Sequence, residues 1–137
     1  MSSVIETAQA FFAACDTGKG WEGCSVYCTP NATFAAQVDL FADMTTLQQY
    51  AEWMKGLLTM LTDGSYEVKS FAADAGRNNV CVYGVFKGTH LAGGPVPPTG
   101  KTTNTDYVYI IQFEGEKISH MTKIWNSGFA LKELGWA

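Results

Sequence analysis

Positive charge is scarce in this sequence. Lysine and arginine together number nine, only Arg77 is an arginine, and the formal net charge at pH 7 is −4. Proteins that bind nucleic acids neutralise phosphates with clusters of lysine and arginine, and the sequence contains no such cluster. We therefore expect no nucleic-acid partner.

Long apolar segments are missing as well. The purely apolar runs are only a few residues long, whereas a membrane-spanning helix needs about 20 residues. The stretch MSSVIETAQ at the start lacks the charged and apolar regions of a signal peptide. We expect a cytoplasmic protein with no membrane partner.

Cysteine is sparse, and its spacing does not fit a metal site. The four cysteines are Cys15, Cys24, Cys28 and Cys81. Cys24 and Cys28 are four residues apart, but zinc sites usually need a second pair of ligands at short spacing, and none is present. We expect reduced cysteines with a structural role and no bound metal.

What the sequence does contain is a composition typical of a folded domain. Its 137 residues are 47% hydrophobic and 16% charged, which is enough to bury a substantial core. No repeat, low-complexity segment or linker divides the chain. We therefore expect one domain over residues 1–137.

The first half of the chain has the periodicity of helices. Apolar residues at helical spacing predict a helix over residues 4–15, a shorter one over 21–28 and a third over 47–61. Thr46 and Gln49 match a capping box, the pattern that begins many helices, and they predict where the third helix starts.

The second half changes to the period of strands. Four stretches are rich in aromatic and β-branched residues, and they cover residues 65–74, 79–90, 103–113 and 116–125. A further strand, or an extended segment leading into the sheet, is predicted for residues 32–41. A short helical turn is predicted for residues 130–136. This order predicts an α+β fold, with about three N-terminal helices on a curved antiparallel sheet of four to six strands. A cavity open at one end of such a layer would suit a small molecule.

One loop stands out between two of these strands. The stretch GTHLAGGPVPPTGK, residues 88–101, places four glycines and three prolines around His90. Such a loop is stiff, and it could frame a ligand entrance or be an inert long hairpin, although long loops are more often functional. His90 could act as a base, since histidine ordinarily titrates near neutral pH, or it could only hydrogen-bond the loop backbone.

Side chains of the last predicted strand alternate between its two faces. Met121, Lys123 and Trp125 share one face, and His120 lies on the other. If Trp125 lines a cavity, Lys123 does too. A lysine there could have a lowered pKa and bind an anionic or carbonyl substrate, or it could extend to the cavity mouth.

Three stretches resemble the SnoaL-like polyketide cyclases, a family of the nuclear-transport-factor/ketosteroid-isomerase superfamily. They are GTH at 88–90, PPTGK at 97–101 and EKISHMTKIWNSGFALKELG at 116–135. The resemblance implies a cystatin-like cone fold, a homodimer and an intramolecular aldol closure. That reaction needs no metal and no cofactor, only a base for an acidic proton and a donor that holds the enolate.

The family's functional positions are only partly matched. The resemblance places His90 at the pocket histidine and Trp125 at a pocket-lining tryptophan, but Asn126 at the position of the cyclases' catalytic aspartate. Because an amide is not basic, Asn126 can orient a carbonyl or stabilise negative charge but cannot take a proton. His90 is then the candidate base.

The ketosteroid-isomerase positions match less well. The helix-1 tyrosine of that group falls on Phe11, the general-base aspartate near Ala36, and the proton-donating aspartate near Tyr109. Of these, Tyr109 could still donate a hydrogen bond to a ligand.

Two functions are compatible with these residues. The first is a cofactor-independent cyclase or isomerase acting on an apolar, enolisable, polyketide-like molecule, with His90 and Asn126 as catalytic residues. Its expected ligand contacts are Gln37, Tyr109, Met121, Lys123 and Trp125. The alternative is a non-catalytic module that binds a hydrophobic ligand or mediates dimeric interactions, which the missing aspartate favours. In both cases we expect a homodimer that pairs through the outer sheet face.

Overall fold

The computed structural model describes residues 2–94 and 96–137, with side chains from residue 4 onward. Within them the chain forms four helices and five strands. The helices are α1 (Ser2–Asp16), α2 (Gly20–Cys24), α3 (Leu47–Met60) and α4 (Ser127–Glu133). The strands are β1 (Cys28–Ala36), β2 (Ser65–Asp74), β3 (Asn79–Thr89), β4 (Thr102–Glu114) and β5 (Lys117–Trp125).

The five strands form one curved sheet in the order β1-β5-β4-β3-β2. Strands β2 to β5 make an antiparallel meander. The prediction of a wholly antiparallel sheet is wrong at β1, which runs parallel to β5 with Cys28 opposite Ile118 and Ala36 opposite Lys123. The reason is that β1 enters the sheet from α2 at the end where β5 also begins.

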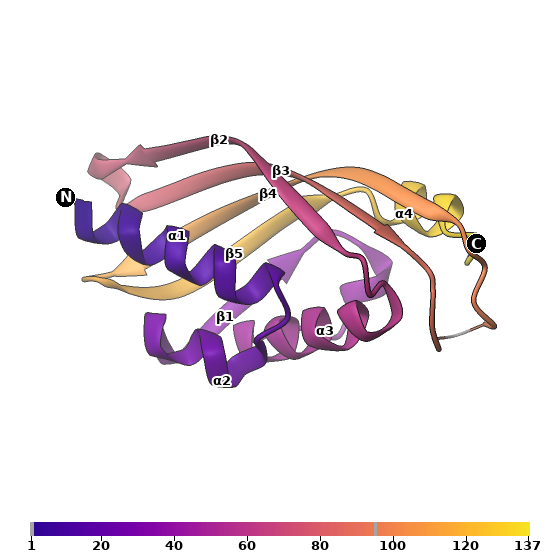
Figure 1. The fold of residues 1–137 in the computed structure, drawn as a ribbon. Coiled ribbons are helices and arrows are strands. Elements are labelled where there is room, and N and C mark those ends of the chain that lie inside the picture. Colours follow the sequence, from indigo (N-terminus) through magenta and orange to yellow (C-terminus); the bar gives the residue numbers. More distant parts are fainter. Residues whose placement is uncertain (1, 95) are drawn as a thin grey trace.

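Helices α1, α2 and α3 lie on one side of the sheet, and α4 lies beside β4 near the end of the chain (Figure 1). This arrangement confirms the predicted α+β layer. On β4 alternate side chains from Thr103 to Phe113 point inward and are buried, and those between them point to the outer face. None of the helices in the described residues has the length and apolar character needed to cross a membrane.

Local signals explain where the elements begin and end. The capping box of α3 is confirmed, because the Gln49 backbone N–H donates to Thr46 Oγ1 at 3.2 Å and Gln49 Oε1 accepts from the Thr46 N–H at 3.0 Å. Helix α2 is shorter than predicted and ends at Cys24. A proline disfavours helical conformation in the residue before it, so Pro30 keeps Thr29 extended and β1 begins at Cys28.

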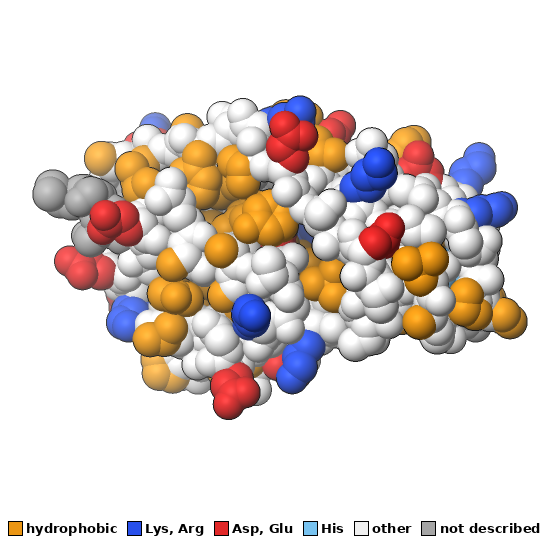
Figure 2. All heavy atoms as spheres, in the orientation of Figure 1, with side chains coloured by type: hydrophobic (Ala, Val, Ile, Leu, Met, Phe, Trp, Pro, Cys, Tyr) orange, Lys and Arg blue, Asp and Glu red, His pale blue; other side chains and the backbone are white. Residues whose placement is uncertain are grey.

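The core lies between the helices and the inner face of the sheet. All four cysteines are free, and three of them are buried there while Cys81 is exposed. On the face seen in Figure 2, hydrophobic side chains gather near the middle, and charged side chains are scattered around them instead of forming a basic patch.

Candidate active site

An apolar cavity of about 340 Å³ lies between α3, the sheet and α4. Its size suits a small organic molecule. Most of its walls are aliphatic and aromatic side chains, and two threonines of β4 contribute hydroxyl groups. The lining residues are Leu40, Trp53, Leu57, Met60, Leu61, Phe86, Thr103, Thr105, Trp125, Ala130, Leu131, Leu134 and Trp136.

A narrow space of about 20 Å³ adjoins this cavity on the inner side. It shares Trp53, Leu57, Phe86, Thr105 and Trp125 with the main cavity, and its volume admits little more than one water-sized group. Its remaining walls are Asp16, Tyr50, Met54, Tyr107, Tyr109 and Lys123. The apolar cavity therefore ends at a small polar recess.

Asp16 is the acid of this recess. It is the last residue of α1 and only 2% exposed. Its Oδ2 accepts a hydrogen bond from the Tyr107 hydroxyl at 2.5 Å, and its Oδ1 accepts one from the Tyr109 hydroxyl at 2.8 Å. The two tyrosines are two residues apart on β4, so both point to the inner face.

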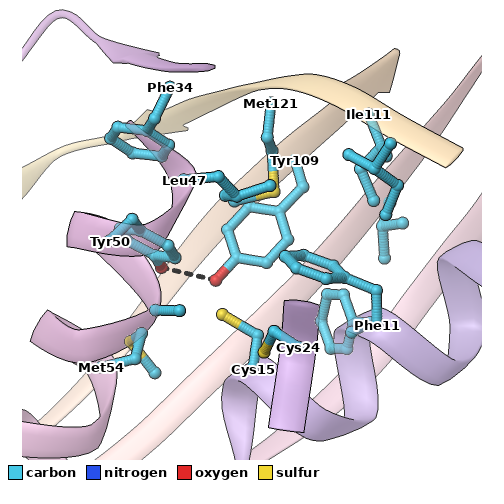
Figure 3. Close-up of a cluster of buried hydrophobic side chains, with 14 of the residues drawn as sticks. Phe11, Cys15, Cys24, Phe34, Leu47, Tyr50, Met54, Tyr109, Ile111 and Met121 are labelled. Atoms are coloured by element: carbon cyan, nitrogen blue, oxygen red, sulfur yellow. Dashed lines mark hydrogen bonds between the residues drawn. The ribbon is translucent and has the colours of Figure 1, made fainter. Parts of the chain in front are cut away.

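The hydrogen bonds continue from Tyr109 to Lys123. Because Tyr109 gives its only hydroxyl proton to Asp16, it accepts from the Tyr50 hydroxyl at 2.5 Å (Figure 3). Tyr50 in turn accepts from Lys123 Nζ at 2.9 Å. We call Asp16, Tyr50, Tyr107, Tyr109 and Lys123 the Asp16 network.

Burial shifts the pKa values of Asp16 and Lys123, the two ends of this network, in the direction that favours their uncharged forms. It raises the pKa of Asp16 to about 6, although the hydrogen bonds from Tyr107 and Tyr109 and the charge of Lys123 act to lower it. Burial also lowers the pKa of Lys123 to about 8, an effect that the charge of Asp16 partly offsets. Groups that titrate near neutral pH at the end of an apolar cavity are suited to proton transfer.

His90 lies outside both cavity linings. It is fully buried, and its Nδ1 accepts from Trp136 Nε1 at 2.9 Å and from the Thr99 backbone N–H at 3.2 Å. An indole N–H can only donate, so the ring hydrogen is on Nε2, which donates to the Gly93 carbonyl. His90 thereby ties the 91–101 loop to the C-terminal segment that lines the cavity. Its catalytic role stays a prediction.

Asn126 does not meet His90 at the cavity. It is the N-cap of α4, where its Oδ1 accepts from the Phe129 N–H at 3.0 Å, and it belongs to neither lining. The strand ends at Trp125, so the next side chain serves the turn into the helix.

The expected ligand contacts divide into two groups. Trp125 lines the main cavity, and Tyr109 and Lys123 line the inner recess. Met121 is fully buried in the core and lines neither space. Gln37 is exposed and borders a surface recess, which Lys123 and Trp125 also line. Only the first group stands where a molecule in the cavity could reach it.

Sequence reasoning missed Asp16, although a signal for it exists. Ala8 and Phe12 lie on the buried face of α1, and Asp16 continues that row at the same four-residue spacing. An acid that extends an apolar stripe is a candidate functional group. Among the described residues, no group of three or more His, Cys, Asp or Glu side chains could hold a metal ion.

Comparisons with known proteins agree with this fold. A family model described as SnoaL-like polyketide cyclase matches residues 6–134. AclR from Streptomyces galilaeus, a proposed hydroxylase, has a similar structure with a TM-score of 0.80 at 20% identity, over 100% of this chain and 98% of that one. A proposed SnoaL-like polyketide cyclase from Jannaschia has a TM-score of 0.80 at 14% identity, over 99% and 94% of the two chains.

A third similar structure comes from Catenulispora acidiphila. It is a protein of ketosteroid-isomerase-like fold in complex with trimethylamine, with a TM-score of 0.71 at 17% identity over 96% of this chain and 94% of that one. At such identities the likeness concerns the fold. No curated protein matches the sequence significantly.

Proposed function

Because the chain belongs to the SnoaL-like polyketide cyclase family, we propose that it binds an apolar, enolisable molecule in the cavity and cyclises or isomerises it without a cofactor. The observation that carries this proposal is the buried carboxylate of Asp16 at the inner end of an otherwise apolar cavity. Its pKa of about 6 suits a general base that works near neutral pH.

Four side chains of the recess take part in this proposed chemistry. Asp16 takes a proton from the carbon next to a carbonyl of the bound molecule, and Tyr107 and Tyr109 hold the carboxylate in place. The positive charge of Lys123 favours the enolate that forms. The enolate carbon then attacks a second carbonyl, which closes a ring, or is reprotonated at another position.

The test measures proton abstraction directly. We would incubate the protein with 2-tetralone, an apolar bicyclic ketone, in D₂O and follow deuterium incorporation by NMR. Asp16→Asn keeps the size of the side chain but removes its basicity, so we expect exchange to slow by about 10²–10⁴-fold. Asp43→Asn, which changes an exposed loop acid, is the matched control.

Binding is measured separately through the tryptophans that line the cavity, Trp53, Trp125 and Trp136. Quenching of their fluorescence by 2-tetralone should survive in Asp16→Asn. Equal exchange rates in Asp16→Asn and the wild type would contradict the role of Asp16. Binding without any exchange in the wild type would support the alternative, a non-catalytic ligand-binding module.

A further inference from the structure

Lys123 differs from every other lysine of the protein. It is 6% exposed, whereas all the others are exposed. It lies on the inner side of β5, where strand alternation places it between Met121 and Trp125. It forms no salt bridge with any described residue.

Aromatic rings surround the amine of Lys123. Six ring centroids lie 4.2–5.9 Å from Nζ, and the nearest belongs to Trp125. The other rings are those of Phe41, Tyr50, Trp53, Tyr107 and Tyr109. The only hydrogen bond of Nζ within the described residues goes to Tyr50. An ammonium has three N–H donors, so most of its hydrogen-bonding capacity is unused.

Burial favours the neutral form of this amine. Burial lowers the pKa of Lys123 to about 8 against the opposing charge of Asp16. The other titratable groups around it are the hydroxyls of Tyr50, Tyr107 and Tyr109. At pH 7.5 roughly a quarter of the amine is then neutral, compared with about 0.1% for an exposed lysine, and the neutral amine is the form that attacks carbonyls.

The recess also limits what can reach this amine. Its volume of about 20 Å³ admits only the head of a ligand, while the main cavity of about 340 Å³ accepts the body. We propose that Lys123 forms a Schiff base with a terminal carbonyl of an elongated, apolar aldehyde or ketone. The inference rests on the proposed function, because it assumes that the cavity is the small-molecule site.

The covalent step is balanced without an external oxidant or reductant. Nζ attacks the carbonyl carbon, and the carbonyl oxygen leaves as water with the two amine hydrogens. The imine nitrogen then takes up one proton from solvent. The iminium ion so formed carries a positive charge at this position and withdraws electrons from the neighbouring carbon, whose proton Asp16 removes. The resulting enamine attacks a second carbonyl, whose oxygen takes the proton from Asp16 as the iminium ion re-forms. Water then hydrolyses the iminium ion and frees Lys123.

Reductive trapping tests the inference on the unmodified protein. The probe is 2-naphthaldehyde with sodium borohydride at pH 7.5, analysed by intact mass and by peptide mapping. We expect one adduct per chain, heavier by the mass of the aldehyde less one oxygen atom, on the peptide that contains Lys123. Its rate should rise with pH to a midpoint near the pKa of about 8.

Variants and a non-reactive analogue distinguish the possible failures. Lys123→Arg should lose the adduct, and Lys55→Arg on the exposed side of α3 should keep it. Absence of a wild-type adduct on Lys123, or labelling spread over the exposed lysines, would overturn the inference. Because the adduct is mapped directly on the wild-type protein, this outcome does not depend on whether a variant folds.

Binding of 2-naphthylmethanol, which lacks the carbonyl, is read from tryptophan fluorescence. If the alcohol binds but the aldehyde is not trapped, the Schiff base is refuted and the proposed cavity function stands. If the aldehyde is trapped at Lys123 but Asp16→Asn exchanges protons at the wild-type rate, the Schiff base is supported and the proposed role of Asp16 as the base is refuted.

Discussion

At the scale of single residues, Asp16 and Lys123 are joined through the hydroxyls of Tyr50 and Tyr109 instead of to each other. Because neither charge contacts the other directly, the free-energy cost of removing each from water is only partly compensated. A direct ion pair would hold the pKa of the carboxyl low and the pKa of the amine high. The spacing by tyrosines leaves both groups able to exchange protons near neutral pH.

This arrangement predicts how stability depends on pH. The pKa of Asp16 is raised by folding to about 6, from about 3.9 in the unfolded chain. Its contribution is therefore complete only below about pH 3 and is lost as the pH rises through 6. The free energy of unfolding of the wild type, minus that of Asp16→Asn, should fall by about 2 kcal/mol between pH 4 and pH 7. Urea titrations over this range measure it, and a constant difference would contradict it.

His90 supports a prediction about the hydrogen bonds that stabilise the fold. Replacing it with alanine leaves the Trp136 indole N–H and the Thr99 N–H without their acceptor inside the protein. We expect His90→Ala to lower the free energy of unfolding by about 2–4 kcal/mol, measured by urea denaturation. His120→Ala, on the outer sheet face, is the control and should cost less. If His90→Ala were fully stable yet abolished proton exchange, the catalytic role predicted from sequence would be supported instead.

At the scale of elements, the glycine- and proline-rich loop after β3 connects the end of α3 to the C-terminal segment. Leu91 and Ala92 donate backbone hydrogen bonds to Met60 at the end of α3. Thr99 Oγ1 donates to the Leu134 carbonyl at 2.7 Å. Since Met60, Leu134 and Trp136 line the cavity, the loop holds the segments that form its outer wall.

The start of α3 carries the element-scale prediction. Thr46 caps the first turn of α3, which also contains Tyr50 of the Asp16 network. Thr46→Ala removes the side-chain acceptor of the Gln49 N–H and should cost about 1 kcal/mol of stability. Gln48→Ala, at an exposed position of the same helix, should be nearly neutral. Thermal or urea unfolding compares the two, and equal effects would contradict a role for the capping box.

At the scale of the whole molecule, the outer face of the sheet carries apolar side chains. Ile124 is 57% exposed, and Tyr83 is exposed beside the half-buried Val108 and Ile110. Apolar groups gathered on one face favour association. The homodimer predicted from the sequence stays a prediction, and it would use this face.

Sedimentation equilibrium at micromolar concentration tests the dimer. We expect twice the mass of one chain for the wild type, and a shift toward one chain for Ile124→Glu, which would place a charge in the interface. Leu91→Glu introduces the same charge at an exposed apolar residue of the 91–101 loop and should leave the dimer intact. A wild-type protein of single-chain mass would contradict the prediction.

The sequence by itself determined the parts of this protein that depend on local order. Strand β2 occupies the predicted residues 65–74, α3 begins at its capping box, and Tyr109, Lys123 and Trp125 point inward as alternation requires. Periodicity and capping act between residues a few positions apart, so a single sequence records them. The family resemblance added the cone fold.

Only the tertiary structure decided which side chains line the cavity and its inner recess. Asp16 meets Tyr107 and Tyr109 across 91 and 93 residues of chain, and no local pattern records such a contact. The parallel pairing of β1, the burial of His90 behind Trp136 and the capping role of Asn126 were decided in the same way. Burial and charge from remote elements set the pKa of a side chain, so the pKa values of Asp16 and Lys123 shift only when the chain has folded.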